Sequence, residues 1–169
     1  MLEKIDVRTI SDNPFSLIGE RWALITAGDE TACNTMTASW AGVGVLWNKP
    51  VATIYVRPQR YTYEFTENSE YFTLTFFAPG EQREALALCG TKSGRDMDKF
   101  AAAGLHVAYA ECGAPYVEEG ELVLVCRKLY AQDLKGECFL EESLIEKNYP
   151  ARDFHRMYVG EITEALRRK

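Results

Sequence analysis

The alternation of apolar and polar residues along the chain predicts a protein built mainly from β-strands. In residues 71–77, Tyr-Phe-Thr-Leu-Thr-Phe-Phe, two phenylalanines and a leucine face one way and the threonines the other. This period of two is typical of a half-buried strand. Residues 122–126 are apolar at every position, which predicts a central strand that is covered on both faces.

Other apolar segments extend this β pattern. Residues 22–26 and 34–40 are separated by a turn signal at residues 28–30, Gly-Asp-Glu, and predict a hairpin with a loop longer than two residues. Residues 51–56 are β-rich and bounded by prolines, which cannot donate ladder hydrogen bonds. Residues 158–162 predict the closing strand.

Helical signals are fewer and shorter. A helix can begin over residues 61–66, and residues 81–89 carry acidic residues in the first turn and are followed directly by a glycine. We expect Asp96 to cap a further helix over residues 99–103, which Gly104 stops. Short strands joined by such pieces predict a mainly β barrel with peripheral helices.

The domain organisation follows from length and composition. The 169 residues are 47% hydrophobic, and they contain no internal repeat and no Pro-, Gly- or Ser-rich linker. Two domains would be small against the usual size of about 100–150 residues. We therefore expect one domain over residues 1–169, with its core at about 13–162.

Charge and cysteine usage narrow the partners. Lys and Arg number 19 against 25 Asp and Glu, a net charge of −6 that disfavours nucleic-acid binding. No apolar run is long enough to span a membrane, and the mixed-charge start lacks a signal-peptide core, so we expect a cytoplasmic protein. The five cysteines are then reduced thiols, and two histidines without paired cysteines predict no metal site.

The common catalytic motifs are absent from this chain. It has no G-x-S-x-G nucleophile elbow, no G-x-G-x-x-G dinucleotide loop and no Walker A sequence. The chemistry is therefore more simply sought in a cofactor site built from dispersed polar groups.

The first such segment is residues 34–40, where short polar side chains crowd a predicted strand. Asparagine is depleted in strands, and polar side chains there often line a pocket in which backbone N–H groups meet a ligand. The alternative is a polar-faced strand with an ordinary core Met and Trp. The candidate residues are Asn34, Thr35, Met36, Thr37, Ser39 and Trp40.

The second segment places two guanidinium groups at a strand end and a helix start. Arg57 and Arg60 offer bidentate donors, Thr62 offers a hydroxyl, and the helix N-terminus adds unpaired N–H groups. Together they predict a seat for a phosphate group. The alternative is surface charge pairing with Glu64 or Glu67.

A loop and a histidine complete the candidates. The loop over residues 90–100 combines glycines with hydroxyl and cationic groups, which is typical of loops that close over ligands, although a solvated connection between helices is the alternative. His155, just before the last strand, could donate to a ligand or carry a proton near neutral pH, or be structural.

In this order, the segments resemble the flavin reductase-like family with the FMN-binding split barrel, and within it the flavoredoxin-type branch. The resemblance covers about residues 13–162. Its motifs are residues 34–40, residues 57–62, residues 92–96 with 98–100, and His155 before residues 158–162.

The resemblance implies a mostly antiparallel split β-barrel, usually a homodimer with FMN near the subunit interface. Arg60 and Thr62, with Arg57, match the phosphate seat, and residues 35–37 match the edge that contacts the ring. The implied cofactor-binding residues are Asn34, Thr35, Met36, Thr37, Ser39, Trp40, Arg57, Arg60, Thr62, Ser93, Gly94, Lys99 and His155.

Three functions stay open at this point. The first is NAD(P)H-dependent reduction of flavin, and the second is an FMN electron carrier of the flavoredoxin type that is fed by a redox partner protein. The third is a split barrel that binds a different ligand, such as haem or a small phosphate compound. No nucleotide-binding Rossmann unit distinguishes NADH from NADPH. No residue is required as a general acid or base, and His155 is the sole catalytic candidate.

Overall fold

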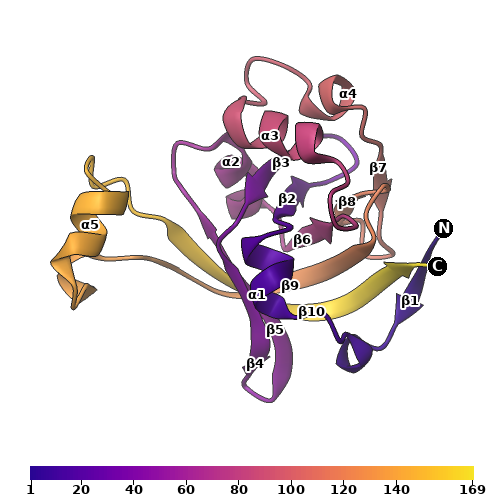
Figure 1. The fold of residues 1–169 in the computed structure, drawn as a ribbon, viewed down its shortest axis with the longest axis horizontal. Coiled ribbons are helices and arrows are strands. Elements are labelled where there is room, and N and C mark those ends of the chain that lie inside the picture. Colours follow the sequence, from indigo (N-terminus) through magenta and orange to yellow (C-terminus); the bar gives the residue numbers. More distant parts are fainter.

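The computed structural model describes residues 1–169 and centres on an eight-stranded antiparallel sheet (Figure 1). The strand order is β3-β2-β6-β9-β10-β5-β4, and β1 pairs with the C-terminal part of β10. The strands are β1 (Leu2–Ile5), β2 (Ala23–Gly28), β3 (Cys33–Ala38), β4 (Ala41–Leu46), β5 (Lys49–Val56), β6 (Tyr71–Phe76), β9 (Leu122–Asp133) and β10 (Arg156–Arg168). The edge strands β3 and β4 do not pair, so the sheet does not close, and the predicted mostly antiparallel split barrel is confirmed.

The remaining elements surround this sheet. A small hairpin is formed by β7 (Val107–Tyr109) and β8 (Pro115–Val117). The helices are α1 (Pro14–Gly19), α2 (Tyr61–Asn68), α3 (Arg83–Thr91), α4 (Lys99–Ala103) and α5 (Glu142–Asn148), with 3-10 turns η1 (Val7–Thr9) and η2 (Gly136–Cys138). In Figure 1, α2, α3 and α4 gather at the end of the sheet that holds β2 and β3. None of these helices has the length and apolarity needed to traverse a lipid bilayer.

The main core lies on the face of β6 that carries its phenylalanines. Phe72, Leu74 and Phe76 are fully buried there against the apolar face of β9. The prediction that this strand is half-buried is wrong, because the threonine face is covered by the β7–β8 hairpin. Thr73 Oγ1 donates to the carbonyl oxygen of Pro115 at 2.7 Å, and Thr75 is also fully buried.

The predicted helices form, but their first or last residues differ from the prediction. The helix predicted over residues 81–89 is α3, which continues through Gly90 to Thr91. The cap of α4 is Asp98 rather than Asp96, because the Asp98 carboxylate accepts from the first free N–H groups of the helix. Gly104 ends α4 with a φ of 64°, as predicted.

The last strand, β10, pairs with three other strands and contains two β-bulges. β10 pairs with β5, β9 and β1, and its register shifts between Val159 and Gly160 and again between Ile162 and Glu164. At the first bulge, a Cβ on Gly160 would lie 2.8 Å from the Phe72 ring, so only glycine allows this close approach.

Beyond the body of the sheet, β9 and β10 carry a projecting arm formed by residues 134–155. It contains α5 and stands apart from the other helices in Figure 1. The arm has an aromatic cluster of its own, in which the rings of Phe139, Tyr149 and Phe154 lie 4.9–5.9 Å apart. The last residues of the arm return toward the ends of β3 and β5, where the candidate site lies.

Candidate functional site

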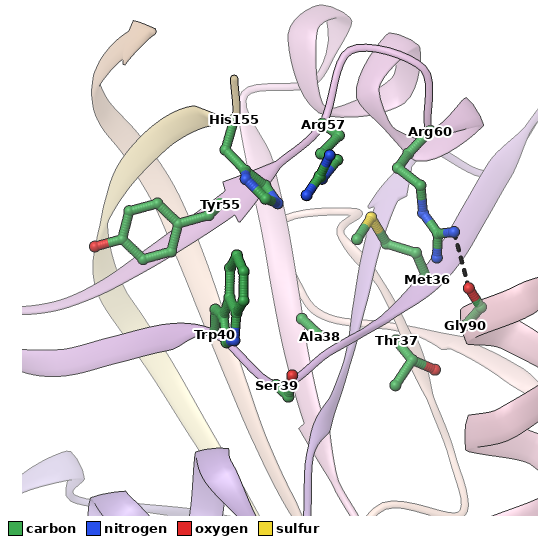
Figure 2. Close-up of a pocket in the computed structure, with 10 residues that line it drawn as sticks. All are labelled: Met36, Thr37, Ala38, Ser39, Trp40, Tyr55, Arg57, Arg60, Gly90 and His155. Carbon is green, nitrogen blue, oxygen red and sulfur yellow. Dashed lines mark hydrogen bonds between the residues drawn. The ribbon is translucent and has the colours of Figure 1, made fainter. Parts of the chain in front are cut away.

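A cavity of about 240 Å³ lies where the end of β3, the end of β5, the C-terminus of α3 and the arm meet (Figure 2). Antiparallel pairing sets Val56 opposite Arg156, so Arg57 and His155 emerge side by side from neighbouring strands. The cavity is lined by Met36, Thr37, Ala38, Ser39, Trp40, Tyr55, Arg57, Arg60, Gly90 and His155.

Arg57 is fixed to the arm. Its guanidinium is ion-paired with Asp153 and donates to the carbonyl oxygen of Asn148 at 2.7 Å. It also lies over the ring of Tyr149, 5.1 Å from the centroid. The donors from Arg57 help to hold the pKa of Asp153 below its usual value. Arg57 therefore ties the arm to β5 and keeps a positive charge at the cavity wall.

Arg60 faces the cavity without a carboxylate partner. It donates to the carbonyl oxygens of Gly90 at 2.8 Å and Cys89 at 3.4 Å, at the end of α3 (Figure 2). Burial lowers its pKa, and so does the nearby charge of Arg57, but no carboxylate acts on it. An arginine stays protonated in spite of such a shift, so the cavity holds a half-buried cation that lacks a counter-charge.

Lys99 adds a second such cation behind the same helix end. It is only 3% exposed, and its Nζ donates to the carbonyl oxygen of Cys89 at 2.9 Å. Burial lowers the pKa of Lys99 to about 8, which leaves it mostly protonated at neutral pH. Together with Arg60, Lys99 makes this region electropositive and favours an anionic group in the cavity.

His155 supplies a neutral polar group. It is 8% exposed, and burial together with the charge of Arg57 lowers its pKa to about 4. Its Nδ1 lies 2.7 Å from the hydroxyl oxygen of Tyr149, and its ring lies 5.4 Å from that of Trp40. Trp40 is 48% exposed, so an aromatic surface remains open beside this imidazole.

The structure brings some of the candidate residues together in this cavity and separates others from it. Those that line the cavity are Met36, Thr37, Ser39, Trp40, Arg57, Arg60 and His155. Those outside it are Asn34, Thr35, Thr62, Ser93, Gly94 and Lys99. Thr37 turns its hydroxyl away, since Oγ1 donates to the carbonyl oxygen of Leu86 at 2.6 Å.

The residues outside the cavity have partners of their own. Thr62 is buried and its hydroxyl accepts from Asn34 Nδ2 at 2.9 Å, so it does not face the cavity with Arg60. Thr35 is buried and bonded to Thr26 and to the carbonyl oxygen of Ile25.

A second cavity of about 500 Å³ lies beside the loop that joins α3 and α4. Asn34, Gly94 and Lys99 line it together with Tyr61 and other residues. A Cβ on Gly94 would lie 2.1 Å from Asn34 Oδ1, so this loop is packed against β3 and is not simply a solvated connection.

The alternative interpretations of the polar segments are resolved in part. Arg57 pairs with Asp153 and not with Glu64 or Glu67, and Glu64 pairs with Arg95 instead. In residues 34–40, Met36 is packed in the main core, as the simpler interpretation required. Trp40, in contrast, is half exposed at the cavity.

Sequence reasoning missed several contributors to the site. Tyr55 lines the cavity, and Tyr149 and Asp153 hold its histidine and its arginine. The Arg57–Asp153 pair joins residues 96 positions apart, and no local pattern signals such a contact. For Tyr55, the alternation of β5 was a usable signal, because Tyr55 and Arg57 share one face of that strand.

Comparisons with known proteins agree with this architecture. Residues 15–169 match the sequence pattern of the family described as "Flavin reductase like domain". An FMN-binding domain of a flavin reductases-like enzyme from Shewanella baltica is 18% identical, with a TM-score of 0.71 over 99% of this chain and 77% of that chain. Flavoredoxin of Desulfovibrio vulgaris is 21% identical, with a TM-score of 0.68 over 99% and 78%. At these identities the likeness is one of fold.

A curated relative extends the comparison to a longer protein. The high molecular weight rubredoxin of Moorella thermoacetica is 27% identical over 116 residues, which are 69% of this chain and 42% of the relative. The chain thus spans less than half the length of that relative. The family pattern, in contrast, covers nearly the whole chain, and the chain therefore belongs to the flavin reductase like domain family.

Proposed function

We propose that this protein binds FMN in the cavity between β3 and the arm, and acts as an NAD(P)H-dependent flavin reductase. The observation that carries the proposal is Arg60, a half-buried guanidinium that faces the cavity with no carboxylate to neutralise it. A half-buried charge without a counter-charge is costly, and an anionic ligand would relieve that cost.

The donor set fits the parts of FMN. Arg60 would bind the phosphate with charge-assisted hydrogen bonds, and Lys99 would add its field from behind the end of α3. Met36 and Trp40 would cover the ring, and His155 would supply a polar contact at its edge. When bound, FMN would supply the redox chemistry, by taking a hydride from reduced nicotinamide and passing electrons on.

The role of the chain's own residues is then to bind, orient and exclude water. The proposed function requires no general acid or base from the cavity, and His155, whose pKa is lowered to about 4, carries no imidazolium proton to donate at pH 7. The positive charges of Arg57 and Arg60 would favour the more negative state of a bound group and so raise its reduction potential.

We also propose that a second copy of the chain completes the site. The cavity of about 240 Å³ lies below the roughly 300–1,000 Å³ of typical ligand pockets, and Trp40 on its wall is half exposed. Val45 and Trp47, at the tip of the β4–β5 hairpin, are exposed apolar side chains suited to an interface. Sedimentation velocity with and without FMN tests this, and a monomer that still binds FMN tightly would contradict it.

The alternative function is an FMN electron carrier that does not oxidise nicotinamide itself. A specific observation favours it: the curated relative is named a rubredoxin and is more than twice as long as the matched segment. A structural neighbour named flavoredoxin points the same way. In this case a redox partner protein would reduce the flavin.

An absorption spectrum decides between these functions. The purified protein is loaded with FMN, freed of excess, and treated anaerobically with NADH and, separately, with NADPH. Retained flavin bands that bleach with one nicotinamide support the reductase and identify its donor. Bands that bleach only with dithionite support the carrier. If no flavin is retained and a titration detects no affinity, the proposal of an FMN protein is wrong.

A further inference from the structure

Tyr149 and His155 form a buried contact at the wall of the cavity. The Tyr149 hydroxyl oxygen lies 2.7 Å from His155 Nδ1, and the two residues are only 5% and 8% exposed. Tyr149 is held in place by the rings of Phe139 and Phe154 and by the guanidinium of Arg57 over its face. A pair so enclosed by neighbours has little freedom to rotate apart.

Both members of the pair are neutral at pH 7, so a single proton lies between them, and either the phenol oxygen or Nδ1 carries it. Burial raises the pKa of the Tyr149 phenol and lowers that of His155 to about 4. If Nδ1 carried the proton, the buried phenol O–H would be left without an acceptor, because His155 is the sole side-chain partner of that hydroxyl. If the phenol donates, both groups are satisfied.

We propose that Tyr149 is a positioning residue that holds His155 as the Nε2–H tautomer and so turns a neutral N–H donor toward the cavity. Figure 2 shows the His155 ring directed between Trp40 and the guanidinium of Arg57. No hydrogen bond within the chain involves Nε2, and this atom is not among the fully buried polar atoms that lack a partner, so its proton is available to a ligand in the cavity that His155 lines.

The side chains around this N–H indicate which kind of ligand atom accepts a hydrogen bond from it. The His155 N–H lies beside the half-exposed indole of Trp40. A planar ligand stacked on this indole would therefore present its edge to the N–H. The acceptor is therefore a carbonyl oxygen or an unprotonated ring nitrogen on a planar heterocycle. The assignment of that heterocycle to flavin rests on the proposed function, whereas the tautomer itself does not.

The experiment is a long-range ¹H–¹⁵N spectrum of the ligand-free protein at pH 7. The chain has only two histidines, and His106, which faces Glu119 at 2.6 Å on the surface, is identified by the variant His106→Gln. We expect His155 to show a protonated Nε2 and an unprotonated Nδ1. A protonated Nδ1 in the native protein would overturn the proposal.

The variant Tyr149→Phe keeps the ring and its packing and removes only the hydroxyl. We expect this variant to lose the single tautomer, with Nδ1–H populated alongside Nε2–H. Phe139→Leu disturbs the same cluster without touching the histidine and should keep the native tautomer. An unchanged tautomer in Tyr149→Phe, or the same loss in Phe139→Leu, would show that the hydroxyl does not set it.

Titration with FMN separates this inference from the proposed function. We expect Tyr149→Phe to bind FMN about three- to tenfold more weakly than the native protein, the loss expected for one neutral hydrogen bond. Equal affinity would overturn the contact between Nε2–H and the flavin. If the native protein does not bind FMN, the proposed function fails, and the spectrum of the ligand-free protein still decides the tautomer.

Discussion

Arg60 and Lys99 share one acceptor, the carbonyl oxygen of Cys89, from which Arg60 Nη2 lies 3.4 Å and Lys99 Nζ 2.9 Å. Cys89 lies in the last turn of α3, where free carbonyl groups and the helix dipole favour cations. The two positive charges are thus held by a helix end and not by carboxylates. This leaves the region with a net positive charge that a ligand anion can neutralise.

Replacing Arg60 tests this charge directly. Arg60→Ala removes the guanidinium that faces the cavity, and we expect FMN binding to weaken by about 1.5–3 kcal/mol, the cost of a lost charged hydrogen bond. The matched control is Arg95→Ala, which removes an exposed arginine that pairs with Glu64 outside the cavity. Quenching of flavin fluorescence gives both affinities. An unchanged affinity in Arg60→Ala would remove Arg60 from the site.

Lys99 predicts an increase of stability with pH. Its pKa is about 8 in the folded protein against 10.5 for the unfolded residue, so between these values the unfolded chain binds more protons. The free energy of unfolding must therefore rise with pH through this window. The free energy of unfolding of Lys99→Met should exceed that of the native protein by the largest margin below pH 8. This margin should shrink by about 3 kcal/mol by pH 10.5. Urea unfolding at several pH values measures the difference, and a constant difference would contradict the burial of a charged Lys99.

The close approach at Gly160 predicts a steric cost. In Gly160→Ala the new methyl would lie 2.8 Å from the Phe72 ring and 2.9 Å from Cys126 Cβ, inside the main core. We expect a loss of about 1–3 kcal/mol in the free energy of unfolding. Gly42→Ala, in the edge strand β4 with open space around it, is the control and should be nearly neutral. A second change, Phe72→Leu, should cost less in the Gly160→Ala background than in the native protein, because it relieves the clash.

The sequence predicted the elements that carry a local signal. The period of two in β6 and the polar run in β3 were visible without tertiary information, and both strands form where expected. The exact ends of the helices were less predictable. For α4, residue type alone makes Asp96 and Asp98 equally good N-caps. Only the backbone geometry shows that the Asp98 carboxylate accepts from Phe100 and Ala101.

Contacts between distant segments could not be predicted in the same way. The threonine face of β6 looked solvent-exposed because its cover, the β7–β8 hairpin, comes about forty residues later in the chain. The arm was missed for a similar reason, since α5 has only one buried side chain, Ile145, and so a weak apolar pattern. The candidate site is formed partly by this arm. The arginines of the site were predicted from their own segment, but Tyr149, which lies in the arm and orients His155, was not.

The ion pair between Arg57 and Asp153 predicts how the arm responds to mutation and to acid. Asp153→Ala removes the carboxylate that accepts from both Arg57 and Gln59, and we expect faster amide hydrogen exchange in residues 137–153. The main sheet lies outside the arm, so its exchange should stay unchanged. Asp133→Ala removes a carboxylate that pairs with Arg156 at the base of the arm and serves as the control.

Acidification should have the same local effect in the native protein. The pKa of Asp153 is lowered from 3.8 by its donors, so the stabilisation that it contributes is complete above that value and is lost as the pH falls through the lower folded pKa. We therefore expect the native protein and Asp153→Ala to differ in arm exchange at pH 7 and to converge only at strongly acidic pH. A difference that vanished already between pH 5 and 6 would assign the hold on the arm to another group. Equal exchange at pH 7 would show instead that the Asn148 carbonyl alone is enough to hold Arg57.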